Sequence, residues 1–120
     1  MNTHDFKIPF GYMEMQMISC DQMPGLSIMD HGQMVARYYK DLVNHLRNGA
    51  DLENEWRLPD WINDPIILEN LLPDDIMETY HIYHDCGKPR CIEWDEDGKR
   101  HFPNHAECSK ETWLLAGGDP

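Results

Sequence analysis

The residues with the clearest chemical potential form one string, His84-Asp85-Cys86-Gly87-Lys88-Pro89. An imidazole followed directly by a carboxylate offers one nitrogen and one oxygen ligand to a single divalent cation. Lys88 follows at once and can contact a substrate phosphate. A His-Asp pair on its own also occurs at the polar end of many helices, but the longer string indicates metal-assisted hydrolysis of a phosphoester.

Three segments, in the same order, resemble the HD-domain phosphohydrolase superfamily. They are residues 27–35, which contain His31, the string at 84–89, and residues 95–107, where an acidic Asp-Gly turn precedes His105. The string is similar to that of the HD domains of tRNA nucleotidyltransferases and of stand-alone phage HD proteins. The resemblance covers about residues 27–116 and implies an all-α, HD-like helical bundle.

The resemblance also implies a metal site. It assigns His31, His84 and Asp85 as metal ligands and His105 as a second-metal ligand or a phosphate contact. The family's last ligand is an aspartate on a later helix, but here the only aspartate after His105 is Asp119, which follows two glycines at the end of the sequence. Because Asp119 does not fit the family pattern well, we expect weak metal binding and low or absent hydrolysis.

The expected chemistry uses His84, Asp85 and Lys88 as the catalytic group. A divalent ion on mixed nitrogen and oxygen ligands would polarise a phosphoryl oxygen and lower the pKa of a bound water, and manganese, iron, cobalt, nickel or zinc suits such ligands better than calcium. The expected partner is a small phosphorylated substrate, such as a nucleotide. Its phosphate contacts are expected from four residues: Lys88, Arg90, Arg100 and His105.

The sequence leaves two alternative functions open. The first is a small structural zinc module, because two thiols are followed by two imidazoles, namely Cys86, Cys91, His101 and His105. The interval between the two pairs is shorter than in a usual zinc finger. The second alternative is an HD scaffold that has lost catalysis and acts as a binding protein, which the poorly matched last aspartate favours.

The candidate ligands must be positioned by helices, and apolar periodicity with capping residues predicts where these run. One helix is expected from Ser27 or Asp30 to a C-terminal cap at Gly49. A short buried helix is expected from Asp64-Pro65 through Leu72. The His-Asp string should end a helix that begins at Pro73, buries a face with Ile76, Tyr80 and Tyr83, and is capped by Gly87.

The remaining chain is expected to pack around these helices. Asp95-Glu96-Asp97-Gly98 predicts the turn of a single β-hairpin, and Asn104 predicts the cap of a last helix over residues 105–116. Trp56 and Trp61 should pack the loop after Gly49 against the domain. As domains, we expect residues 1–26 to form an N-terminal arm and a Met-rich segment packed on an HD-like domain at 27–120, which lacks the family's closing C-terminal helix.

Composition limits the function. The 120 residues contain 22 acidic residues against 10 Lys and Arg, which gives a formal charge of −12. This charge repels nucleic-acid backbones and anionic membranes, so duplex nucleic acid and membranes are not expected partners. The start of the sequence lacks the pattern of a signal peptide, and we expect a cytoplasmic protein with its four cysteines reduced.

Overall fold

The computed structural model describes residues 7–120, and these form a mostly helical fold with two small antiparallel strand pairs. The helices are α1 (Phe10–Ser19), α2 (Ile28–Asn48), α3 (Pro65–Glu69), α4 (Asp74–Tyr83) and α5 (His105–Leu115). Short 3₁₀ helices lie at η2 (Asp60–Asn63) and η3 (Lys88–Arg90). The predicted all-α class is therefore confirmed, although the structure has two small strand pairs where one hairpin was predicted.

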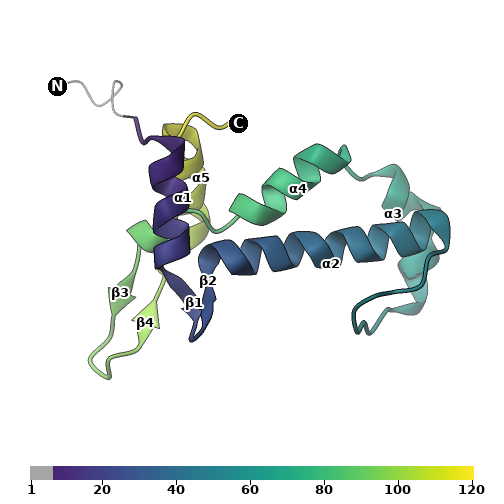
Figure 1. Cartoon of the computed structure of the whole chain (residues 1–120), viewed down its shortest axis with the longest axis horizontal. Helices are drawn as coiled ribbons and strands as arrows, with labels where there is room; N and C mark the ends of the chain where they lie inside the picture. Colours follow the sequence, from purple (N-terminus) through teal and green to yellow (C-terminus); the bar gives the residue numbers. More distant parts are fainter. Residues whose placement is uncertain (1–6) are drawn as a thin grey trace.

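Helix α2 is the long axis of the molecule, with α4 lying alongside it and α3 near its far end (Figure 1). Its predicted ends are confirmed. The Ser27 hydroxyl accepts a hydrogen bond from the Asp30 amide at 3.0 Å, and Gly49 adopts the left-handed conformation at φ 68°. These caps define where α2 begins and ends, which places His31 in its first turn.

The core lies where α1 meets the start of α2 and the segment after α4. Its completely buried side chains are Met13 and Met17 of α1, Ile28 of α2, and Cys86. Figure 1 shows α1 beside α5 at this end of the molecule. The Met-rich segment therefore contains a helix, α1, which supplies half of these four side chains. Residues 1–6 of the expected N-terminal arm lie outside the described part.

The two strand pairs are short. Strands β3 (Glu93–Trp94) and β4 (Arg100–His101) form the predicted hairpin, with Trp94 opposite Arg100. A second pair, β1 (Asp21–Met23) and β2 (Leu26–Ser27), leads into α2 and was not predicted. Its turn is made by Pro24-Gly25, and Gly25 there has φ 81°.

Several local predictions were wrong. Helix α3 has no buried residue, and Ile66 and Leu72 are exposed. Helix α4 exposes Ile76 and Tyr80, which were expected inside. Asn104 precedes α5 as predicted, but it has φ 54° and its side chain makes no capping hydrogen bond.

Gly87 does not have the helix-capping role that was predicted for it. Its φ is −90°, so it does not end α4 as a left-handed cap. A side chain at Gly87 would instead overlap with the backbone of Cys108 and Ser109. Glycine is therefore required because the chain after α4 passes directly against α5.

Candidate metal centre

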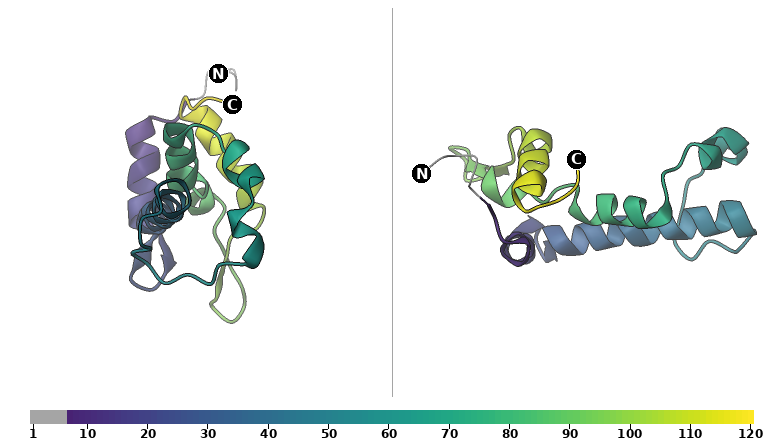
Figure 2. Two further views of the ribbon diagram at one scale, coloured as in Figure 1. Left: turned by 90° about the vertical axis from the view of Figure 1, so that its right-hand side faces the viewer. Right: turned by 90° about the horizontal axis from the view of Figure 1, so that it is seen from above.

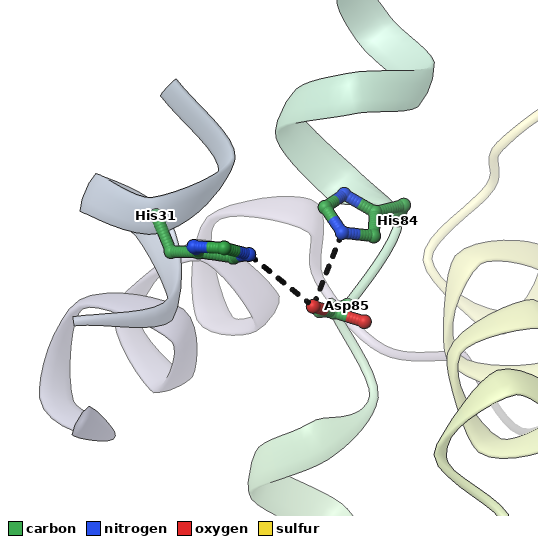
Figure 3. A group of neighbouring side chains, drawn as sticks. All are labelled: His31, His84 and Asp85. Carbon is green, nitrogen blue, oxygen red and sulfur yellow. Dashed lines mark ion pairs between the residues drawn. The ribbon is translucent and has the colours of Figure 1, made fainter. Parts of the chain in front are cut away.

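The site is formed by residues from two helices that lie side by side. His31 stands in the first turn of α2, His84 follows the last residue of α4, and Asp85 comes directly after it (Figure 3). Their ligand atoms all lie within 4.8 Å of one another. Among residues 7–120 this is the one group of three or more such side chains that could hold a metal ion.

A close helix crossing brings His31 to the pair. Gly32, the next residue of α2, lies so near to α4 that a side chain would overlap with the carbonyl oxygen of Ile82. Ile82 is two residues before His84. Gly32 was not predicted to have this role, although an isolated glycine inside a helical pattern can indicate close packing.

The segment around Asp85 is held by the core on one side and by α5 on the other. The Cys86 thiol is completely buried and donates to the Ser109 carbonyl oxygen at 3.3 Å. The amide of Gly87 donates to the Ser109 hydroxyl at 3.0 Å, and Arg90 donates to the Thr112 hydroxyl at 3.0 Å. These contacts hold the turn rigidly, so the Asp85 side chain has a defined position beside the histidines.

One oxygen of Asp85 is the centre of the group. The Oδ2 atom lies 3.1 Å from His84 Nε2, 4.0 Å from His31 Nε2 and 3.2 Å from Lys88 Nζ. Although burial by itself would raise the pKa of Asp85, His84 and Lys88 together lower it to about 2. Asp85 is therefore an anion throughout the physiological range, as a metal ligand must be.

The two imidazoles differ in their surroundings. His84 Nδ1 lies 2.7 Å from the His81 carbonyl oxygen, which fixes the ring with Nε2 toward Asp85. The hydrogen bond to Asp85 raises the pKa of His84. Burial lowers the pKa of His31 and so favours the neutral imidazole, and its buried Nδ1 has no hydrogen-bond partner among the described residues.

The donor set fits a divalent ion. Bonds of about 2 Å to each ligand can bridge ligand atoms up to about 4 Å apart. Two of the measured separations already lie within that limit, and the third is at most 4.8 Å. The expectation that His31, His84 and Asp85 converge, although 53 positions separate the two histidines in sequence, is confirmed.

Lys88 is a buried cation at this centre. Only 8% of the residue is exposed, and its ammonium contacts Gln22 Oε1 at 2.9 Å as well as Asp85. The ammonium also lies 5.3 Å from the centre of the Phe102 ring. Gln22, in β1, was missed by the sequence analysis because the strand pair that carries it was not predicted.

The other predicted contacts lie around the group rather than in it. The Arg100 guanidinium stacks on Trp94 and on Phe102, at 5.9 and 5.8 Å from the ring centres, so Arg100 and Lys88 share Phe102. His105 is exposed, with Nδ1 3.2 Å from the Phe102 carbonyl oxygen. Asp119 is exposed too, and its backbone oxygen accepts from Trp113. The metal-ligand group among residues 7–120 includes neither.

The four residues of the alternative zinc module do not gather. His101 is paired with Asp95 in the hairpin at 2.8 Å, and Cys86 is in the core. No three of Cys86, Cys91, His101 and His105 form a metal-ligand group within the described chain.

Three further findings concern membrane spans, the cysteines and similarity to known proteins. No helix in the described part is long and apolar enough to cross a bilayer. All four cysteines are free thiols. Comparison with protein-family models, with curated proteins and with solved structures finds no match for this chain.

Proposed function

We propose that this chain is a metal-dependent phosphohydrolase of the HD type, which acts on a nucleotide or another small phosphoester. The observation that carries the proposal is the meeting of His31 with the His84-Asp85 pair, within 4.8 Å, beside the buried cation of Lys88. Metal ligands and a phosphate-binding charge are the two parts that metal-assisted phosphoester hydrolysis requires.

The proposed cofactor is one divalent ion of manganese, iron, cobalt, nickel or zinc, because two imidazoles and one carboxylate suit these metals. When bound, such an ion polarises a phosphoryl oxygen and lowers the pKa of a coordinated water toward neutrality. Three protein ligands leave further positions for water and substrate. A single carboxylate neutralises only half of the ion's charge, so the affinity is expected to be modest.

The protein residues have distinct proposed roles. His84 is held in one orientation by the His81 carbonyl, which keeps Nε2 available as a ligand. Lys88 offsets the negative charge of the substrate phosphate next to Asp85. Arg100 and His105, which flank Phe102, are proposed to contact the rest of a small phosphorylated substrate.

Arg90 is the weakest of the proposed substrate contacts. Its guanidinium is held by Thr112, and it lines a separate pocket with Cys91 and Cys108.

A non-catalytic scaffold is the second candidate, and one observation favours it. The Oδ2 atom of Asp85 already has His84 and Lys88 at hydrogen-bond distance, so the carboxylate is satisfied without an ion. In that case the cluster would stabilise the fold, and metal would bind only if it displaced these cations.

The experiment that distinguishes the two candidate functions compares the same substitution at two aspartates, one inside the metal-ligand group and one outside it. Manganese is titrated into the wild type, Asp85→Asn and Asp119→Asn, and each protein is then assayed with a panel of nucleotides and simple phosphoesters. We expect Asp85→Asn to lose at least about 100-fold in manganese affinity together with all hydrolysis, since it removes the only carboxylate ligand. Asp119→Asn, exposed and outside the group, should match the wild type.

Equal manganese binding by the wild type and Asp85→Asn would overturn the proposal. Tight binding by the wild type that is lost in Asp119→Asn would show instead that Asp119 closes the site. No hydrolysis of any substrate, with or without metal binding at Asp85, would support the scaffold.

A further inference from the structure

Two thiols gather where the chain after α4 packs against α5. Cys91 directly follows η3, and its Sγ donates to the Lys88 carbonyl oxygen at 3.6 Å. Cys108 lies in α5, and its Sγ donates to the Gly87 carbonyl oxygen at 3.3 Å. Because Gly87 and Lys88 are consecutive, the two sulfur atoms meet at one short stretch of backbone.

Cys91 and Cys108 also line the same open pocket. An open pocket of about 610 Å³ is lined by Cys91 and Cys108 together with residues of the hairpin and α5. Its charged lining residues are Arg90, Glu93, Glu107, Lys110 and Glu111. Each thiol is half-buried, so a small molecule in the pocket can reach it.

The other two cysteines differ from this pair. Cys86 is completely buried and its thiol is held by Ser109, so a reagent cannot approach it in the folded protein. Cys20 lies at the end of α1 and does not line the pocket. Cys91 and Cys108 are therefore the two cysteines that line the pocket and are accessible to a reagent.

We propose that Cys91 and Cys108 form a redox-active dithiol site that reacts with a small peptide disulfide, such as oxidised glutathione, and closes to an intramolecular disulfide. The cations of Arg90 and Lys110 on the pocket wall can meet the carboxylates of such a peptide. The site is separate from the metal centre, and the inference does not depend on the proposed hydrolysis.

The reaction proceeds by two exchanges. The thiolate of one cysteine attacks a sulfur of the small disulfide, whose S–S bond breaks and releases one small thiolate. The second cysteine's thiolate then attacks the protein sulfur of this mixed disulfide and releases the other small thiolate. The two protons lost by the cysteines are taken up by the departing thiolates. The cysteine pair is oxidised by two electrons and the small disulfide is reduced to two thiols.

Cys91 is mostly a protonated thiol at neutral pH. Burial, together with the charge and hydrogen bond of the neighbouring Cys108, raises the pKa of the Cys91 thiol to about 11. Because the thiolate is the attacking form, exchange through Cys91 should be slow at neutral pH and faster in mild alkali.

The test is carried out on the whole, metal-free chain. The protein is incubated with oxidised glutathione at mildly alkaline pH, quenched with an alkylating reagent and digested with trypsin without reduction. Cleavage after Arg90, Lys99, Arg100 and Lys110 places Cys91 and Cys108 in different peptides, and Cys86 in a third. We expect the Cys91 and Cys108 peptides to be linked, with the loss of two hydrogen atoms from the intact mass.

The variants give a second readout. Cys91→Ser and Cys108→Ser should each stop at a mixed disulfide that retains one glutathione, whereas Cys20→Ser should behave as the wild type. The closed disulfide should raise the Tm by roughly 5–10 °C, because it closes the loop that carries the hairpin, and a reducing agent should reverse this. Mixed disulfides alone in the wild type, a cross-link through Cys86, or no reaction would overturn the proposal.

Discussion

At the scale of single residues, the site is governed by how many side chains contact one carboxylate oxygen. Asp85 Oδ2 lies within 4.0 Å of two imidazoles and one ammonium. The two imidazoles are possible metal ligands, whereas the ammonium of Lys88 has donors only. In the proposed site Lys88 would therefore oppose the ion electrostatically and attract a substrate phosphate.

Replacing Lys88 by methionine should separate these two effects. Methionine keeps most of the buried volume but removes the charge, so manganese affinity should rise by about tenfold while phosphoester hydrolysis falls. Calorimetric titration and an assay at saturating metal measure both quantities. Lys99→Met, in the exposed hairpin turn, is the matched control. A joint loss of metal binding and hydrolysis would mean that Lys88 positions Asp85 rather than the phosphate.

At the scale of elements, the crossing of α2 and α4 decides whether the ligands meet. Gly32→Ala adds one methyl group against the Ile82 carbonyl, which should force the helices apart. We expect a loss of about 1–3 kcal/mol in stability and a larger relative loss of manganese binding. Gly11→Ala, in α1 with open space around it, is the control and should be neutral or slightly stabilising. Unchanged manganese binding in Gly32→Ala would contradict this view of the crossing.

The loop between α2 and η2 is held in place by Asp41, an aspartate of α2. Asp41 accepts hydrogen bonds from the backbone of Glu53 and Asn54, at 2.8 and 3.0 Å, and from the Trp56 indole at 2.9 Å. Trp56 also packs edge-on against Tyr38, so its predicted role in holding the loop is confirmed. Trp61, for which the same role was predicted, is 66% exposed, and that prediction was wrong.

Asp41 should make stability depend on pH. The hydrogen bond from the Glu53 amide, with those from Trp56 and Asn54, outweighs the effect of burial and lowers the pKa of Asp41 to about 2. A depressed carboxyl pKa stabilises the fold above the ordinary value of 3.8, and this contribution disappears as the pH falls toward 2. In urea denaturation, the stability difference between the wild type and Asp41→Asn should shrink between pH 5 and pH 2.

The control for this measurement is Asp51→Asn, which removes an exposed acid of the same loop. A difference for Asp41→Asn that stays constant with pH would show that its hydrogen bonds do not depend on the charge.

The sequence predicted elements best where local chemistry decides the structure. Ser27 and Gly49 end α2 by hydrogen bonding and backbone conformation, and Gly98 shapes the predicted hairpin turn at φ 78°. These features depend on neighbouring residues alone. The candidate metal ligands were identified differently, because His31 and the His-Asp string stand in an order that resembles a known family.

Which face of each helix is buried could not be predicted in the same way. Helix α1 buries Met13 and Met17 but exposes Met15 and Ile18, so its apolar residues show no single face. Helix α4 approaches α2 through backbone at Gly32, which turns Ile76 and Tyr80 outward. Gln22 reaches Lys88 across 66 positions of sequence, and no local pattern could indicate such a contact.

At the scale of the whole molecule, the fold is elongated. Its extents are 53 × 37 × 22 Å and its radius of gyration is 17.0 Å, against roughly 14 Å for a compact domain of this length. The two views in Figure 2 show the narrow end-on profile and the long arm formed by α2, α3 and α4. With a charge of −12 spread over this shape, repulsion between like charges is an appreciable term.

Salt should therefore stabilise the protein. Raising sodium chloride from 10 mM to 0.3 M shortens the screening length from about 30 Å to below 10 Å, and we expect the Tm to rise by a few degrees. A chelator in all samples keeps metal out of the comparison. The surface pairs Lys40–Glu78 and Arg47–Asp74 would be weakened by salt, but exposed pairs contribute little. A fall in Tm would show that attractive pairs outweigh the net repulsion.

The central claim is that His31, His84 and Asp85 hold one divalent ion, and a crystal grown with manganese tests it most directly. Anomalous diffraction measured near the manganese absorption edge locates the ion without reference to its ligands. We predict one strong peak about 2.0–2.3 Å from Nε2 of His31, Nε2 of His84 and a carboxylate oxygen of Asp85. A crystal with no peak at this group, or with the manganese bound only elsewhere on the chain, would contradict the account.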